Sequence, residues 1–319
     1  MEQPFATVIV DDGRVLSGPY RSPRNMLSEQ AYGGHASIHD DATARKLGFK
    51  SATIEGPTHF SQFVPLGYRL WGDCWLQQGC LSAAYKAACH EGEEVMAFMA
   101  KPEAGETQVA IWMTRSDGTE VLRGTASVGA GNPPSAIETK LAALPAPDPF
   151  RVILKDVEPG AKRPRERVRL GFDDVMGSLY PFSLRRKLLM ITEPSPWYAE
   201  RAETPWGGPV IPFEMISVLL HHIAVSDPWL GADPTIDLFV DQELRLVAGP
   251  LLVGENYDIE RTVVALSGSR RTESTWIRTN VFRPDSTDLI ATMLINIASF
   301  KDSYPDYDEK LAAIRSAMA

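Results

Sequence analysis

The chain has 319 residues, of which 44% are apolar, and it carries a formal net charge of −9 at pH 7. This length accommodates two ordinary domains, whereas the acidic balance argues against a nucleic-acid partner. No apolar run approaches the roughly 18 residues of a membrane helix and the amino terminus lacks a basic leader, so we expect no membrane partner and a cytoplasmic location. Three cysteines form neither a metal-binding spacing nor an even disulfide set, which agrees with a reducing compartment.

Segment 34–59 is rich in small residues and histidine and leads into the first predicted helix. His39 precedes a turn of small residues, and Glu55 stands just before a predicted helix at 57–71. Apolar and polar residues then alternate with the period of a strand. The predicted strands lie at 81–90, 90–100, 108–118 and 120–128.

The second half of the chain repeats this order. A helix is predicted at 212–224, and strands follow at 239–250, 252–265, 273–285 and 289–298. Gly92 and Trp112 match Gly254 and Trp276 at an offset of about 160 residues, which indicates a duplication. We predict one module at 1–130, a linker rich in Pro and Ala at 131–150, and a second module at 151–319.

Each module is predicted to be a helix on a curved antiparallel sheet. A sheet with one apolar face must be covered, and the helix that precedes the strands is the obvious cover. The predicted fold class is therefore α+β. A short helix is expected at the carboxyl end.

Three residues of segment 34–59 suggest chemistry. His39 and Glu55 carry groups that transfer protons, and a helix amino terminus concentrates positive potential at the Gly56 amide. This combination suits reactions of an acyl group. A structural explanation also fits, in which His39 is a surface turn residue and Glu55 is a carboxylate that stabilises the helix start.

These residues resemble the signature of the MaoC-like or (R)-specific enoyl-CoA hydratase family. That signature reads D-x-N-P-x-H, then an alanine and a Gly-Phe pair, then A-H-G; here the chain has G-H-A-S-I-H, Ala44, Gly48-Phe49 and I-E-G. His39 matches the catalytic His and Gly56 the oxyanion glycine, whereas Gly34 replaces the catalytic Asp and Glu55 the second His. The resemblance implies a double hotdog fold, an acyl-thioester substrate and coenzyme A as its carrier.

The corresponding motif of the second module is E-P-S-P-W-Y, at 193–198. Glu193 takes the Asp position and Tyr198 the His position. This motif forms either a second site or a degenerate half retained for packing, and we favour the latter because a tyrosine with a pKa of about 10 is a poor base at neutral pH. Tyr198 can still donate a hydrogen bond to a substrate, and His59, one turn into the first helix, can contact the substrate or orient Glu55.

Three functions remain open from the sequence. A hydratase or dehydratase would use His39 and Glu55 to move protons while the Gly56 amide holds the thioester oxygen. A thioesterase would use Glu55 to attack the thioester carbonyl or to direct water at it. A non-catalytic hotdog subunit would need a second chain with an intact Asp/His pair.

The expected partners follow from the same residues. We expect a small-molecule acyl thioester and a homodimer, and neither a cofactor nor a metal ion, because the sequence has no phosphate-binding loop and no ligand cluster.

Overall fold

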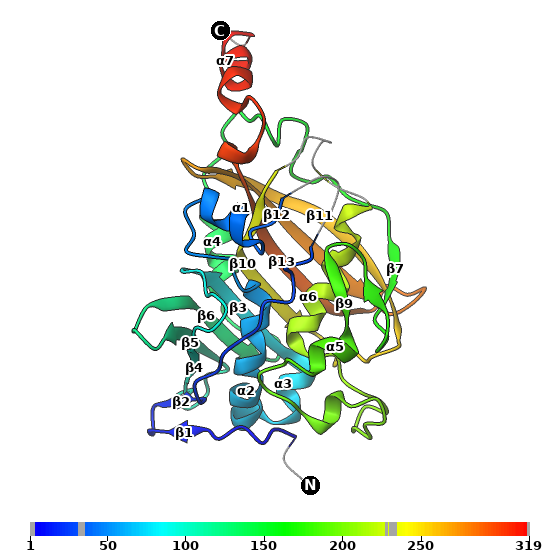
Figure 1. Cartoon of the computed structure of the whole chain (residues 1–319). Coiled ribbons are helices and arrows are strands. Elements are labelled where there is room, and N and C mark those ends of the chain that lie inside the picture. Colours follow the sequence, from blue (N-terminus) through cyan, green and yellow to red (C-terminus); the bar gives the residue numbers. More distant parts are fainter. Residues whose placement is uncertain (1–3, 31–35, 227–228, 230–234, 318–319) are drawn as a thin grey trace.

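A single antiparallel sheet runs through the whole molecule. The computed structural model describes residues 4–30, 36–226, 229 and 235–317 (Figure 1). Eleven strands of this part pair in the order β1-β2-β4-β5-β6-β3-β10-β13-β12-β11-β7, and a separate two-stranded hairpin is formed by β8 and β9.

The amino-terminal half forms one end of this sheet together with a group of short helices. Its elements are β1 (Val10–Asp11), β2 (Val15–Ser17), α1 (Asp41–Lys46), the 3-10 helix η1 (Gly56–Phe63), α2 (Val64–Trp71), α3 (Asp73–Gln78), β3 (Gly79–Tyr85), β4 (Val95–Ala100), β5 (Gln108–Arg115), β6 (Glu120–Val128) and α4 (Ala136–Ala142).

The carboxyl-terminal half forms the other end and has longer strands. Its elements are β7 (Glu166–Arg169), β8 (Val175–Met176), β9 (Tyr180–Ser183), α5 (Leu184–Leu188), η2 (Pro196–Tyr198), α6 (Phe213–His221), η3 (His222–Val225), β10 (Asp237–Leu246), β11 (Asn256–Gly268), β12 (Thr272–Phe282), β13 (Leu289–Phe300), η4 (Lys301–Ser303) and α7 (Tyr307–Ala317).

The strand order shows the duplication. The first repeat reads β4-β5-β6-β3 and the second, in the opposite direction, β10-β13-β12-β11, so that β3 and β10 pair at the centre. Leu81 lies opposite Leu244 in this central pair. Gly92 and Gly254 both adopt a positive φ, of 84° and 86°, before the second strand of their repeat, as expected for equivalent turns.

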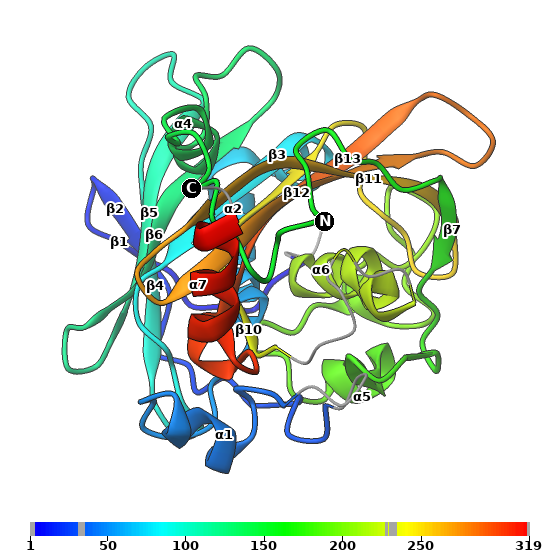
Figure 2. The ribbon, with the colours of Figure 1, turned by 90° about the horizontal axis from the view of Figure 1, so that it is seen from above.

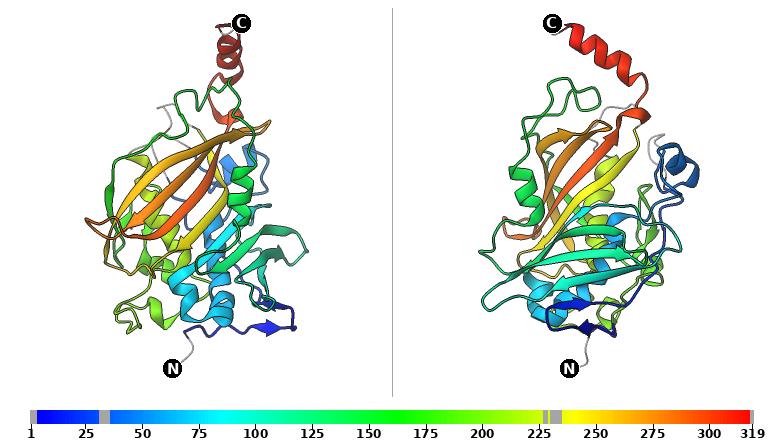
Figure 3. Two further views of the ribbon diagram at one scale, coloured as in Figure 1. Left: turned by 180° about the vertical axis from the view of Figure 1, so that it is seen from behind. Right: turned by 90° about the vertical axis from the view of Figure 1, so that its left-hand side faces the viewer.

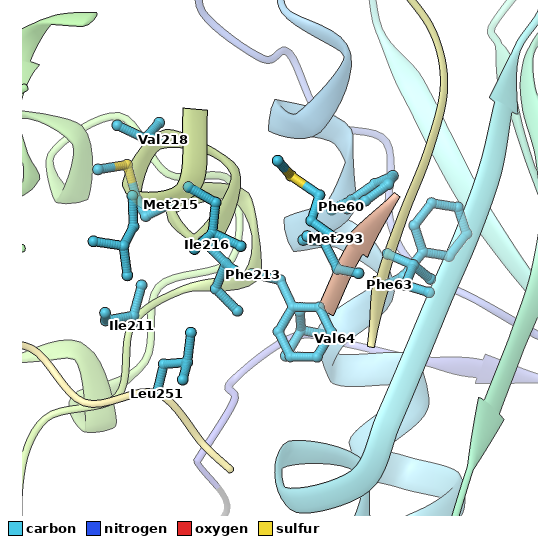
Figure 4. Packing of buried hydrophobic residues seen from close by; sticks show 14 of the residues in the cluster. Phe60, Phe63, Val64, Ile211, Phe213, Met215, Ile216, Val218, Leu251 and Met293 are labelled. Atoms are coloured by element: carbon cyan, nitrogen blue, oxygen red, sulfur yellow. The ribbon is translucent and has the colours of Figure 1, made fainter. Parts of the chain in front are cut away.

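The predicted helices lie within the curve of the sheet, where η1 and α6 contact each other (Figure 2). Phe213 of α6 stacks on Trp75 of α3 with the ring centroids 5.4 Å apart. Phe213 also lies close to Val64, at the junction of the two repeats (Figure 4). The two helix groups and the sheet therefore share one hydrophobic core.

Two predicted segments differ from the structure. The helix expected at 57–71 is a 3-10 helix up to Phe63 and becomes α-helical only in α2. Pro57 and Pro65 stand near the start of these two helices, where a missing N–H is tolerated, so each proline favours a new helix start.

The predicted linker at 131–150 contains α4. Ser135 and Glu138 form a capping box at its start, and Ile137 packs against Trp276 and Leu294 of the second repeat. The linker therefore covers part of the sheet, while the domain boundaries themselves stay a prediction. The expected carboxyl-terminal helix is α7, which projects from the body of the molecule (Figure 3).

Candidate functional site

A cavity of about 530 Å³ lies between the two repeats. The first repeat contributes His39, Glu55 and Gly56 to its wall, and the second repeat contributes Tyr180 and His221. The rest of the wall comes from both repeats, and the second-repeat sheet contributes many of its apolar residues. These apolar residues include Leu238, Phe239, Ile277, Met293, Ile295 and Ile297.

Glu55 is the most unusual ionisable group of this cavity. It is the residue before η1, and only 8% of its surface is exposed. Burial raises its pKa to about 7, Lys187 opposes this rise, and Glu214 adds to it. Its Oε1 atom has no hydrogen-bond partner among the described residues. Glu55 is therefore a carboxyl group that both gains and loses a proton near neutral pH.

His39 offers an acceptor atom to the same cavity. Its Nδ1 lies 2.7 Å from the carbonyl oxygen of Thr53. Because a carbonyl only accepts, Nδ1 carries the hydrogen, and Nε2 keeps its lone pair in the neutral ring. Removal from bulk water lowers the pKa of His39 to about 4, so the ring is neutral at pH 7.

Gly56 is required by the packing of its neighbour. A Cβ atom at this position would lie 2.5 Å from Cζ of Tyr85, so any other residue would force the Tyr85 ring or the backbone to move. The Tyr85 ring is held by a 2.9 Å hydrogen bond from its hydroxyl to Gln242. The Gly56 N–H is at the start of η1, and the part of the chain that the structure describes offers it no acceptor. This amide is therefore available to a negatively charged oxygen.

Two further residues of the cavity were not predicted from the sequence. The hydroxyl of Tyr180, in β9, lies 3.1 Å from Nδ1 of His221, at the end of α6, and both residues line the cavity together with Glu55. No motif marks Tyr180. The adjacent pair His221-His222 indicates only that the two rings point in different directions.

The remaining predicted site residues divide between the cavity and the core. His59 lines the cavity, and burial lowers its pKa to about 4. Glu193 and Tyr198 do not line it. Glu193 instead accepts two hydrogen bonds from Arg21, at 2.6 and 3.0 Å, and one from Thr7, while Tyr198 packs against Phe5.

The expected substrate contacts of Glu193 and Tyr198 are therefore not part of the site that we describe. Their surroundings explain this, because an ion pair and an aromatic contact tie them into the core. Gly34, at the position of the family Asp, lies outside the described residues.

The second repeat has its own buried carboxylate, but this group is already paired. Glu214 stands in the first turn of α6, much as Glu55 stands at the start of η1. Lys187 lies 3.0 Å from its Oε2, and Ser61 donates a 2.8 Å hydrogen bond to its Oε1. Neither Glu55 Oε1 nor Glu214 Oε2 has a hydrogen-bond partner among the described residues, but Glu214 Oε2 is neutralised by the Lys187 ion pair, whereas Glu55 Oε1 has no such contact.

Metal sites and membrane-spanning helices are both absent from the described part of the chain. The described residues contain no group of three or more His, Cys, Asp or Glu side chains placed to hold a metal ion. None of the helices described is both long and apolar enough to cross a bilayer.

Comparison with solved structures identifies the fold. A Chloroflexus aurantiacus J-10-fl protein, named as a MaoC domain protein dehydratase, matches with a TM-score of 0.52 and 14% identity over 93% of this chain and 95% of its own. A conserved hypothetical protein from Mycobacterium tuberculosis, described as a double hotdog fold, matches with a TM-score of 0.51 and 13% identity over 92% and 96%. The predicted double hotdog fold is confirmed.

Sequence comparison added nothing to this result. No protein-family model matches the chain, and neither does any curated protein sequence. At 13 and 14% identity the similarity to the solved structures concerns the fold and leaves the reaction open.

Proposed function

We propose that the protein is an acyl-thioester hydratase or dehydratase whose reaction takes place beside Glu55. One observation carries the proposal. Glu55 has a buried oxygen without a hydrogen-bond partner in the described part of the chain and a pKa of about 7, and it shares a cavity with a neutral imidazole and Gly56. The carboxyl group can carry a proton, the imidazole can accept a hydrogen bond from water, and the Gly56 amide can donate a hydrogen bond to an oxyanion.

The proposed hydration uses Glu55 twice. His39 Nε2 accepts one hydrogen of a water molecule and orients it. The water oxygen bonds to the β carbon of the enoyl thioester while its other hydrogen moves to Glu55. The double-bond electrons move toward the thioester oxygen, which the Gly56 N–H stabilises. Glu55 then returns the proton to the α carbon, so that H and OH have been added, and dehydration reverses these steps.

The substrate is proposed to carry a bulky apolar acyl group. The reacting end lies near Glu55, and apolar side chains of β10, β12 and β13 line a large part of the remaining cavity. Apolar walls favour an apolar ligand, and the volume falls in the range of small-molecule sites. The resemblance of segment 34–56 to the hydratase signature supports coenzyme A as the carrier.

A thioesterase is the second candidate, because the same carboxyl group beside the Gly56 amide can direct water at a thioester carbonyl. The two reactions differ in substrate and product. We would assay purified protein with trans-enoyl-CoA, followed by loss of the conjugated-thioester absorbance, and with saturated acyl-CoA, followed by release of free thiol.

The hydratase proposal predicts water addition without thiol release. It also predicts loss of this activity in His39→Ala and Glu55→Gln, with Tyr198→Phe as a matched variant outside the cavity. Thiol release from saturated acyl-CoA that depends on Glu55 would favour the thioesterase. Inactivity toward both substrates, reversed by adding another hotdog chain, would favour a non-catalytic subunit.

A further inference from the structure

The ring of Tyr85, at the end of β3, packs against the first residue of η1. A Cβ atom built on Gly56 would lie 2.5 to 2.7 Å from Cζ, Cε1 and Cε2 of this ring, which form its hydroxyl end. Phe60, four residues further along η1, stacks on the same ring with the centroids 6.3 Å apart. The start of η1 therefore rests on Tyr85 at two places, and one of them is the backbone of Gly56.

The hydroxyl group of Tyr85 is held by the second repeat. It donates a 2.9 Å hydrogen bond to Oε1 of Gln242, in β10. Gln242 lies opposite Ala83 in the central pair of β3 with β10, and Ala83 and Tyr85, two residues apart on one strand, share a face of the sheet. The hydrogen bond therefore crosses the junction between the two repeats.

Gln242 is fixed in turn by the helix of its own repeat. Its Nε2 donates a 2.8 Å hydrogen bond to Oγ of Ser217, in α6, and both residues are fully buried. The oxygen and the nitrogen of the Gln242 amide are thus both used, so the group cannot turn without breaking a buried hydrogen bond. The position of the Tyr85 ring is therefore set by β10 and α6.

The amide of Gly56 depends on such contacts for its direction. The described part of the chain offers its N–H no acceptor. The chain before it is tied down, because the Ile54 N–H donates a 2.7 Å hydrogen bond to the carbonyl of Cys89. The contact on Gly56 itself is the Tyr85 ring. A donor that stabilises an oxyanion must be in place before the charge develops, so this contact matters for catalysis.

We propose that Tyr85, held by Gln242, is a positioning residue that fixes the Gly56 amide for the thioester oxygen. This proposal rests on the oxyanion role proposed for Gly56, and it adds that the second repeat completes the first-repeat site. Gln242 does not line the cavity, so its effect must pass through Tyr85. Negative charge on the thioester oxygen grows in the transition state, so a misplaced amide lowers kcat and leaves KM nearly unchanged.

The kinetic test compares Tyr85→Phe, Gln242→Leu and the double variant with the wild type. Tyr85→Phe keeps the ring and removes the hydroxyl, whereas Gln242→Leu removes the acceptor at a residue that no substrate in the cavity reaches. Tyr257→Phe is the matched control, since its buried hydroxyl accepts a 2.7 Å hydrogen bond from the Leu252 N–H outside the cavity. For each protein kcat and KM are measured with trans-enoyl-CoA.

The NMR signal of the Gly56 amide provides a readout that does not need turnover. The protein is labelled with ¹⁵N-glycine and with glutamate carrying ¹³C at its backbone carbonyl, which selects the Glu-Gly pairs at 55–56 and 91–92. Gly92 does not line the cavity and serves as the internal reference. The ligand is a saturated acyl-CoA analogue in which CH₂ replaces the thioester sulfur, so its carbonyl is kept while neither hydration nor thiol release can occur.

We expect Tyr85→Phe and Gln242→Leu each to lower kcat about threefold to tenfold, as for one lost hydrogen bond between neutral groups, with KM nearly unchanged. The double variant should be no slower than Gln242→Leu, because both changes remove the same contact. The analogue should shift the Gly56 signal in the wild type and in Tyr257→Phe, and less in the two single variants.

An unchanged shift of the Gly56 signal in both single variants, or no shift in the wild type, would overturn the proposal. If the wild type hydrates no enoyl-CoA but the analogue shifts the Gly56 signal and the two variants reduce this shift, the proposed reaction is wrong and the positioning of Gly56 by Tyr85 holds.

Discussion

Replacement of Lys187 by Met tests how the site is held together. Lys187 enters the contact between η1 and α6, where its Nζ lies 3.0 Å from Oε2 of Glu214 and 3.1 Å from the hydroxyl of Thr58. The side chains of Lys187 and Glu214 are only 4% and 1% exposed. Removing the cation leaves a buried carboxylate unpaired, which costs about 3 to 5 kcal/mol of the free energy of unfolding.

Arg185, two residues earlier in the same short helix, provides the control. It also forms ion pairs, with Asp173 and Glu200, but its side chain is 48% exposed and that of Asp173 is 73% exposed. Water and salt screen such a pair, so Arg185→Met should change stability far less than Lys187→Met.

Urea unfolding followed by tryptophan fluorescence measures both effects. The double variant with Lys187→Met and Glu214→Gln should recover most of the lost stability, because it removes the stranded charge. Equal losses for Lys187→Met and Arg185→Met, or a double variant no more stable than Lys187→Met, would refute the reasoning. Lys187→Met should also raise the pKa of Glu55 above about 7, since Lys187 favours the ionised form.

Three further predictions follow from single residues of the cavity. The folded-state pKa of Glu55, about 7, exceeds its ordinary value of 4.5, so its contribution to stability is complete below pH 4.5 and is lost as the pH rises through 7. Urea midpoints should record this loss of roughly 3 kcal/mol in the wild type and a flatter pH profile in Glu55→Gln; identical profiles would contradict it. Gly56→Ala forces a Cβ against Tyr85 and should cost about 1 to 3 kcal/mol in thermal or urea unfolding and slow turnover, whereas Gly18→Ala, with open space around its Cβ, should do neither. Ile297→Phe narrows the cavity and should lower kcat/KM for long acyl chains more than for short ones; an equal effect on both would place the acyl group elsewhere.

The sequence pattern predicted two α+β modules, and the resemblance to the hydratase signature added the double hotdog fold. Alternating apolar residues predict the eight long strands in the right order, because each of these strands has one face toward the core. The short strands β1, β2 and β7, at the two ends of the sheet, were missed, since two to four residues are too few to show a period. The helix α4 was missed because the prolines around it indicated a linker.

The site was only partly predictable, for a different reason. His39, Glu55 and Gly56 lie within one short segment and resemble a known signature, so sequence reasoning finds them together. Tyr180 and His221 reach the cavity of Glu55 only through the fold, from a hairpin and a helix end more than a hundred residues away, and neither has a local pattern. Glu193 and Tyr198 show the converse, because they match the motif by position while their side chains pack into the core.

The central pairing of β3 with β10 has a consequence for folding during synthesis on the ribosome. While the ribosome is still translating the second repeat, β3 has already been synthesised. The edge of β3 that pairs with β10 in the folded protein then has backbone N–H and C=O groups without a partner strand. An early intermediate with such an open edge invites association with other nascent chains. Expression at low temperature or with abundant chaperones should therefore raise the soluble yield of the full-length chain, and a truncated first repeat should aggregate.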